Sequence, residues 1–169
     1  MKKFLFSIFG AMLGYLISCT NQNASTSSNA AMEKKNLSAD SLIGEAFRTG
    51  DASKIDDVVA ADFVDHTDRG DKNRDSLKAM IKMVHDSFPS MKMDLIKTTA
   101  DSNYVYAWMR FSGNSNGAMG MPKGPFDMQS MEVTRYNNDG KAVEHWGFME
   151  AQSNTKMMHE MMKQMMGNK

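Results

Sequence analysis

The chain has 169 residues, and 20 Lys and Arg residues balance 20 Asp and Glu residues, so its formal net charge is zero. This balance excludes the broad basic surface of a nucleic-acid-binding domain and the charge excess of an acidic solvating chain. Hydrophobic residues make up 41% of the chain, which is enough for the core of one small folded domain. A single cysteine excludes an intramolecular disulfide and a zinc site built from cysteines.

The N-terminus has the pattern of a bacterial lipoprotein signal. Two lysines precede an apolar run, Phe4 to Ile17, which at about 14 residues is shorter than the roughly 20 needed to span a bilayer. The run ends in Leu16-Ile17-Ser18-Cys19, which resembles a lipobox, whose cysteine is acylated. We therefore expect a signal peptide over residues 1–18, and a lipid-modified Cys19 that anchors the protein in the cell envelope, at the outer membrane or the periplasmic face. The alternative is an ordinary secretory signal with a chance cysteine.

The lipidated end is expected to lead through a tether into one domain. Residues 20–31 are polar and uncharged, and they contain no large apolar side chain, which predicts a flexible tether over residues 19–31. Residues 32–152 follow as the folded domain. Apolar spacing predicts three helices in its first half: one that Gly50 stops, a short one that Ser53 caps, and one from about Arg74 to Phe88 that ends before Pro89.

Beyond Pro89 the apolar residues alternate with polar ones, as they do in strands. The alternation predicts strands from Met91 onward, over Tyr104–Phe111, over Met128–Tyr136 and over Ala142–Met149. Asn138-Asp139-Gly140 predicts a type I′ hairpin turn. Helices followed by about four strands and a final helix define an α+β fold, with the helices on one face of a curved antiparallel sheet.

Several short motifs follow one another along the chain: Phe47-Arg48-Thr49-Gly50-Asp51, Val59 to His66, His85 to Lys92, Glu132 to Tyr136, Asp139-Gly140-Lys141 and Glu144-His145-Trp146. Together they resemble the SnoaL-like polyketide cyclases (ester cyclases) of the nuclear-transport-factor-2-like (NTF2-like) superfamily. The resemblance covers about residues 37–152. It implies a conical barrel, in which three N-terminal helices pack on a bent antiparallel sheet that opens onto an apolar pocket. A methionine-rich helix over residues 153–169 would be an addition to this fold.

The resemblance also implies a chemistry. Characterised cyclases of this family close a polyketide ring by intramolecular aldol condensation, and an acidic residue is the general acid/base. They use no metal and no cofactor. We therefore expect a small hydrophobic carbonyl compound as ligand, and a cofactor-free cyclase, isomerase or hydrolase as the activity. Many members of the superfamily only bind ligands, so a non-catalytic binding lipoprotein is the alternative. Pairing of two copies through their sheets is common in the superfamily, which makes a homodimer a candidate assembly.

Three residues are candidates for the acid–base chemistry. The acidic residue of the family lies a few positions after the tryptophan of the last strand, and Glu150 matches it best, although the family more often has Asp. His145 and Trp146 face opposite sides of their strand, so His145 and Glu150 both face inward only if Gly147 forms a bulge. Glu132 is a second candidate acid if it faces inward, and otherwise it pairs with an arginine on the outer face. The predicted catalytic residues are Glu150, His145 and Glu132.

Aromatic side chains and one histidine are candidates for the wall of a ligand pocket. Three aromatic residues alternate on one strand and would hold a flat ligand, although packing in the core is the alternative reading. The resemblance places His66 near the mouth of the pocket. Alternatively, His66 binds a metal together with nearby aspartates, or pins a loop through hydrogen bonds. The predicted ligand-binding residues are His66, Tyr104, Tyr106, Trp108, Trp146 and Phe148.

The C-terminal segment contains a regular methionine pattern. Pairs of methionines recur every four residues from Met157 to Met166, which forms a stripe on a helix. We predict that this helix packs against the domain or a partner, because methionine fills irregular gaps. Thioethers also favour Cu(I), so a copper-binding helix is the alternative, and no metal is assigned among the predicted site residues.

Overall fold

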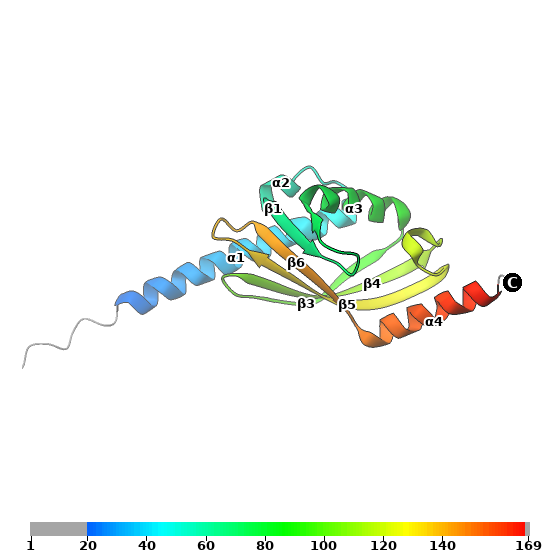
Figure 1. Cartoon of the computed structure of the whole chain (residues 1–169). Helices are drawn as coiled ribbons and strands as arrows, with labels where there is room; N and C mark the ends of the chain where they lie inside the picture. The colour runs from blue at the N-terminus through cyan, green and yellow to red at the C-terminus, as the bar shows by residue number, and fades with distance from the viewer. Residues whose placement is uncertain (1–19, 168–169) are drawn as a thin grey trace, which may run out of the picture.

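The computed structural model describes residues 20–167 of the chain, and their side chains from residue 28 onward (Figure 1). The predicted signal peptide over residues 1–18 and the predicted lipid attachment at Cys19 lie outside this range. Within the described range, no helix is both long and apolar enough to cross a membrane.

The described chain has a mixed α+β architecture with four α-helices, one short 3-10 helix and one sheet. Its elements, in chain order, are α1 (Thr20–Thr49), α2 (Ile55–Val58), β1 (Val59–His66), β2 (Lys72–Asn73), α3 (Arg74–Ser87), β3 (Lys92–Ala100), β4 (Tyr104–Ser115), η1 (Ala118–Gly120), β5 (Gly124–Tyr136), β6 (Ala142–Met149) and α4 (Ala151–Gly167).

The sheet has six strands in the order β2-β1-β6-β5-β4-β3. Strands β3 to β6 form the predicted antiparallel meander. Strand β1 departs from the prediction, because it pairs in parallel with β6 and so makes the sheet mixed. Alternation of apolar and polar residues did not reveal β1, since the strand carries three acidic or histidine side chains, Asp62, Asp65 and His66. The short helix α2 ends at Val58, and Val59 is already the first residue of this strand.

Helices α1, α2 and α3 cover one face of the sheet, which we call the inner face (Figure 1). The core lies between them: Ile55, Val59, Ile81 and Val105 are almost fully buried there. Alternation along β4 buries Val105 and Ala107 on the inner face, and it leaves Tyr106 and Trp108 exposed on the opposite, outer face.

Two local details of the helices differ from the sequence prediction. Helix α1 begins at Thr20, so the residues expected to form a tether are helical. Packing fixes this helix at the buried Asn36 and Ala39. Extending an existing helix by one residue costs little free energy, because the unfavourable nucleation step has already occurred. Ser53 does not cap α2, because its backbone N–H donates to Oδ1 of Asp51 instead, and Lys54 occupies the N-cap position.

The hairpin between β5 and β6 also differs from the prediction. A type I′ turn needs positive φ at both central residues, but within the described range Met119 is the single non-glycine residue with positive φ. The N–H of Gly140 donates to the carbonyl of Asn137, and Gly140 itself has a φ of 65°. The loop is therefore a type I turn followed by a left-handed glycine, and a register shift beside Tyr136 accommodates the extra residue.

The predicted helix ends are confirmed where a residue type dictates them. Helix α1 stops at Thr49, and Gly50 follows it with a φ of 74°. Helix α3 begins after Asn73, whose side chain accepts a hydrogen bond from the N–H of Ser76, and it ends two residues before Pro89.

Candidate acid–base site

Strand β6 places His145 and Trp146 on opposite faces of the sheet, as the sequence predicts. His145 lies beside Asp65 in the parallel register with β1, and beside the buried Thr134 in the antiparallel register with β5. Because neighbouring residues in register share a face, His145 points to the inner face.

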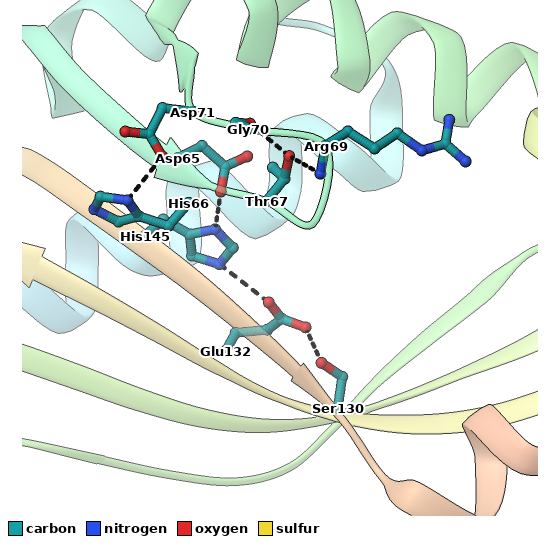
Figure 2. Close-up of polar contacts among 9 residues, drawn as sticks. All are labelled: Asp65, His66, Thr67, Arg69, Gly70, Asp71, Ser130, Glu132 and His145. Carbon is teal, nitrogen blue, oxygen red and sulfur yellow. Dashed lines mark hydrogen bonds and ion pairs between the residues drawn. The ribbon is translucent and has the colours of Figure 1, made fainter.

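Four inner-face side chains from three strands form one continuous hydrogen-bonded chain (Figure 2). Nδ1 of His145 lies 2.8 Å from Oδ1 of Asp65 on β1. Nε2 of His145 lies 3.0 Å from Oε2 of Glu132 on β5. The hydroxyl of Ser130 donates to the other carboxylate oxygen of Glu132. We call Asp65, Ser130, Glu132 and His145 the inner site.

The two carboxylates make His145 a cation. Burial alone would lower the pKa of His145, but the hydrogen bonds and negative charges of Asp65 and Glu132 outweigh this effect and raise the pKa from 6.5 to about 9. At neutral pH both ring nitrogens therefore carry a proton, and each donates to a carboxylate. The side chains of His145 and Glu132 are 28% and 26% exposed, so both groups are partly open to solvent.

Gly147 makes room for the carboxylate of Glu132. The two residues are opposite each other in the β5–β6 register, which is regular at this point, so Gly147 is not a bulge. A Cβ atom at position 147 would lie 3.1 Å from Oε2 of Glu132, which is closer than ordinary van der Waals contact. A side chain here would push Glu132 away from His145.

A second buried pair lies next to the inner site. The hydroxyl of Tyr136 on β5 donates to Oδ1 of Asp40 on α1, at 3.0 Å. Burial raises the pKa of Asp40, while hydrogen bonds from Tyr136 and Thr134 and the charge of His145 oppose the rise. Asp40 was not predicted, because one Asp on a helix normally marks its solvent face. Asp65 was predicted only as a neighbour of His66, because no local pattern shows which distant strand it will join.

The structure brings two of the three predicted catalytic residues, His145 and Glu132, into direct contact. It places Glu150 elsewhere: this residue follows β6, is exposed, and directly precedes α4. Oε2 of Glu150 accepts a hydrogen bond from Ser153 at 3.1 Å. Glu150 therefore stands at the beginning of α4 and does not join the inner site.

The predicted ligand-binding residues gather on the outer face. His66 stacks on Trp146 with ring centroids 4.9 Å apart, and Tyr104 stacks on Tyr106. Trp108 and Phe148 are largely exposed. The sheet itself separates these six residues from His145 and Glu132.

His66 tethers the loop that follows β1. Its Nδ1 lies 3.0 Å from Oδ1 of Asp71 (Figure 2), and its Nε2 lies 3.6 Å from an oxygen of Glu144. These contacts agree with the alternative in which His66 pins a loop.

These observations define a class: an α+β domain with a partly exposed, charged acid–base cluster on the inner face of its sheet. The SnoaL-like polyketide cyclase family model matches residues 39–156, which is most of the chain. The chain therefore belongs to the SnoaL-like polyketide cyclase family.

Solved structures of this fold support the architecture. IdmH from Streptomyces antibioticus, a proposed polyketide cyclase, is 21% identical with a TM-score of 0.59, over 74% of this chain and 96% of that one. AclR from Streptomyces galilaeus, a proposed hydroxylase, is 18% identical with a TM-score of 0.59, over 72% and 79%. A phenazine biosynthesis-related protein from Pseudomonas aeruginosa is 17% identical with a TM-score of 0.57, over 76% and 83%.

These likenesses establish the NTF2-like fold alone. The three proteins have different described roles, so the function of this chain must be argued from its own side chains. No curated protein matches the sequence.

The hydrogen bonds of His145 lead to a pH prediction. Because its pKa is about 9 in the folded protein, above the ordinary 6.5, the stabilisation from its charge is present below pH 6.5 and is lost as the pH rises through 9. Asp65→Asn removes one of the two charges, and we expect it to lower the pKa of His145 by roughly one pH unit or more. An NMR titration of the histidine ring signals measures this.

Asp71→Asn is the matched control for this titration, since Asp71 contacts His66 and not His145. It should leave the pKa of His145 unchanged. A pKa for His145 near 6.5 in the unmodified protein would contradict the paired arrangement.

Proposed function

We propose that the inner site is an acid–base centre for a small, apolar carbonyl compound, and that the protein is a cofactor-free cyclase or isomerase. One observation carries the proposal: a partly exposed imidazolium is held between two carboxylates, and one of these carboxylates, Glu132, is itself partly exposed. Such a cluster presents a base and a hydrogen-bond donor within a few ångströms of each other, which is what enolate chemistry needs.

The charges assign the roles within the inner site. His145 is already protonated at neutral pH, so it cannot be the base, and Glu132 takes that role. The carboxylate of Glu132 removes a proton from the carbon beside the carbonyl, and the electron pair of the C–H bond moves to the carbonyl oxygen. Glu132 is then neutral and holds the Nε2–H of His145 less strongly. This N–H is freed to bind the enolate oxygen when negative charge develops there.

The enolate can then complete either of two reactions. In a cyclase, its carbon attacks a second carbonyl of the same molecule, a C–C bond forms, and Glu132 returns its proton to the new alkoxide oxygen. In an isomerase, Glu132 returns the proton to a different carbon. Asp65 is a positioning residue in both cases, since it holds Nδ1 of His145 and touches no reacting atom in this scheme.

The inner face also carries apolar side chains beyond the inner site. In the β4–β5 register, Met109 lies beside Ser130, and Phe111 follows two residues further along the same face. Both side chains are half-buried. Apolar groups next to a few polar ones are typical of small-molecule sites, which favours an apolar ligand. Binding without catalysis uses the same surface and is the alternative function.

A simple ketone tests the proposal without knowledge of the natural substrate. We expect the protein from Thr20 onward, which retains the whole core, to accelerate exchange of the α-protons of 2-tetralone in D₂O, followed by NMR. Glu132→Gln should lower this rate by roughly a hundredfold or more, because a positioned general base contributes about 10²–10⁴.

Glu150→Gln is the control for this assay. It removes a carboxylate that the sequence alone favours but that the structure places outside the inner site, so it should leave the exchange rate unchanged. Loss of the rate in Glu150→Gln but not in Glu132→Gln would refute the assignment. Binding of 2-tetralone without any exchange would favour the non-catalytic alternative.

We further propose that the protein is attached to the cell envelope through Cys19. The apolar leader and the lipobox-like sequence support this, and both lie outside the described residues. Cys19→Ala should move the protein from the membrane fraction to the soluble fraction of its host, whereas Ser18→Ala should not. A Cys19→Ala variant that stays in the membrane fraction would contradict lipid attachment.

The outer face supports a homodimer as the assembly. Tyr106, Trp108, Met131 and Phe148 are all more than a third exposed on this face, and helices α2 and α3 lie on the opposite face (Figure 1). An apolar surface of this kind favours contact with a second copy of the sheet.

Phe148→Glu tests this assembly, because it places a charge in the middle of the contact, where burial without a partner is costly. We expect light scattering to give a dimer for the unmodified protein and a monomer for Phe148→Glu. Met83→Glu, on the exposed side of α3, should remain dimeric. A monomeric unmodified protein would contradict the homodimer.

A further inference from the structure

Helix α4 occupies a position beside β5 that β6 leaves open. Strand β6 pairs with β5 only from Ser130 to Tyr136, although β5 begins at Gly124. The chain turns into α4 where β6 ends, and α4 then runs past the unpaired first half of β5 (Figure 1). A helix therefore lies where a continuation of β6 would otherwise pair with β5. The backbone edge of β5 is flanked by this helix and is not paired with a strand.

Two pairs of hydrogen bonds hold α4 in place, one pair near each end of this edge. At the first end, the N–H of Glu150 donates to the carbonyl of Gln129, and the N–H of Gln129 contacts the hydroxyl of Ser153. At the far end, the side-chain amide of Gln164 both donates to the carbonyl of Lys123, at 3.0 Å, and accepts from its N–H, at 3.2 Å. The helix is therefore fixed at both ends and spaced from the strand between them.

A cavity of about 340 Å³ lies in this space. Its volume is within the range of about 300–1,000 Å³ that is typical of small-molecule sites. None of the four inner-site residues lines it, so it is a separate place on the molecule. Its apolar wall consists of Met121, Pro122, Pro125, Phe126, Met128 and Met157. Three of these are methionines, one from the loop before β5, one from β5 and one from α4, and such side chains adapt to the shape of an apolar molecule.

The cavity also has a polar side. Backbone groups of β5 alternate in direction, and those of Gln129 bond toward α4, so the N–H of Asp127 points toward α4 as well. Within the described range, the contacts of this edge with α4 are made at Gln129 and Lys123, and Asp127 lies between them. Its N–H and its carbonyl therefore both face the cavity, the first as a hydrogen-bond donor and the second as an acceptor.

Charges on the cavity wall favour one negative group in the ligand. The lining includes two cations, Lys123 and Lys156, and two carboxylates, Asp127 and Glu160. Both oxygens of Asp127 already accept hydrogen bonds from Arg110, at 2.8 and 2.6 Å. Arg110 lies outside the lining and takes up both oxygens of Asp127, so within the lining the two lysines stand against one carboxylate without such a partner, Glu160. This balance disfavours a metal cation and suits a monoanion.

We propose that the cavity between α4 and the first half of β5 binds a small apolar monocarboxylate. Its apolar part contacts the three methionines and Phe126. Its carboxylate accepts from the N–H of Asp127 and pairs with Lys156. The methionine-rich helix is thereby one wall of a ligand site.

Methionine methyl groups provide a direct readout. The protein from Thr20 onward, labelled with ¹³C in its methionine methyl groups, is titrated with 2-naphthoate and followed by NMR. We expect saturable shifts of the Met121, Met128 and Met157 signals, while those of Met165 and Met166, which are more than 70% exposed, stay in place. Single Met→Leu variants assign the signals.

Two variants and a neutral analogue separate this site from unspecific binding. Met157→Trp fills the cavity and should abolish the shifts at Met121 and Met128, whereas Met165→Trp, on the exposed side of α4, should bind like the unmodified protein. Lys156→Gln should weaken 2-naphthoate about fivefold and leave 2-naphthamide unchanged, because only the former carries the charge. If Met157→Trp fails to fold, the Lys156→Gln comparison decides.

Three results would overturn the proposal. They are saturable shifts that persist in a folded Met157→Trp variant, equal affinity of 2-naphthoate and 2-naphthamide, and shifts of the three methyl signals with Cu(I) but not with 2-naphthoate. Since Glu132 takes no part in this cavity, loss of ketone exchange and loss of naphthoate binding are independent outcomes.

Discussion

The parallel pairing of β1 with β6 is the constraint on which the candidate site depends. It brings Asp65 beside His145, while the antiparallel pairing of β6 with β5 brings Glu132 to the other side of the ring. A partly buried histidine next to one carboxylate forms an ordinary ion pair with it. A histidine held between two carboxylates, as His145 is, stays charged well above neutral pH. The inner site therefore exists only in the assembled sheet, because each of its charged groups comes from a different strand.

The alternation of side chains separates two sets of side chains along the same strands. On β1 and β6, Asp65 and His145 face inward, while their direct neighbours His66 and Trp146 stack on the outer face. The same backbone thus positions an acid–base cluster on one face and an aromatic surface on the other. A shift of one residue in register would exchange the two sets of side chains between the faces. The bulge at Arg135/Tyr136 lies outside the site, and the pairing of Glu132 with Gly147 is regular.

Local sequence patterns predicted those parts of the fold that local chemistry determines. Gly50 and Pro89 mark the ends of helices, and the alternation after Pro89 marks the strands of the meander. Strand β1 was missed because its charged residues, Asp62 and Asp65 among them, disguise the alternation, and because parallel pairing joins segments about 80 residues apart. The choice between Glu132 and Glu150 depends on where β6 ends, which the family resemblance did not define closely enough. The outer position of the six predicted ligand-binding residues follows from the alternation of side chains along β1, β4 and β6.

The methionine-rich tail has a physical explanation that needs no metal. Strand β5 extends six residues beyond its partner β6, and an uncovered strand edge invites pairing with other chains. A helix that covers such an edge cannot bond to every backbone group, since its own amides are already paired within the helix. Contact is then made by side chains across an irregular gap, as Gln164 and Ser153 do here. Flexible, unbranched methionines suit that gap, and the space they leave open is the cavity beside Asp127.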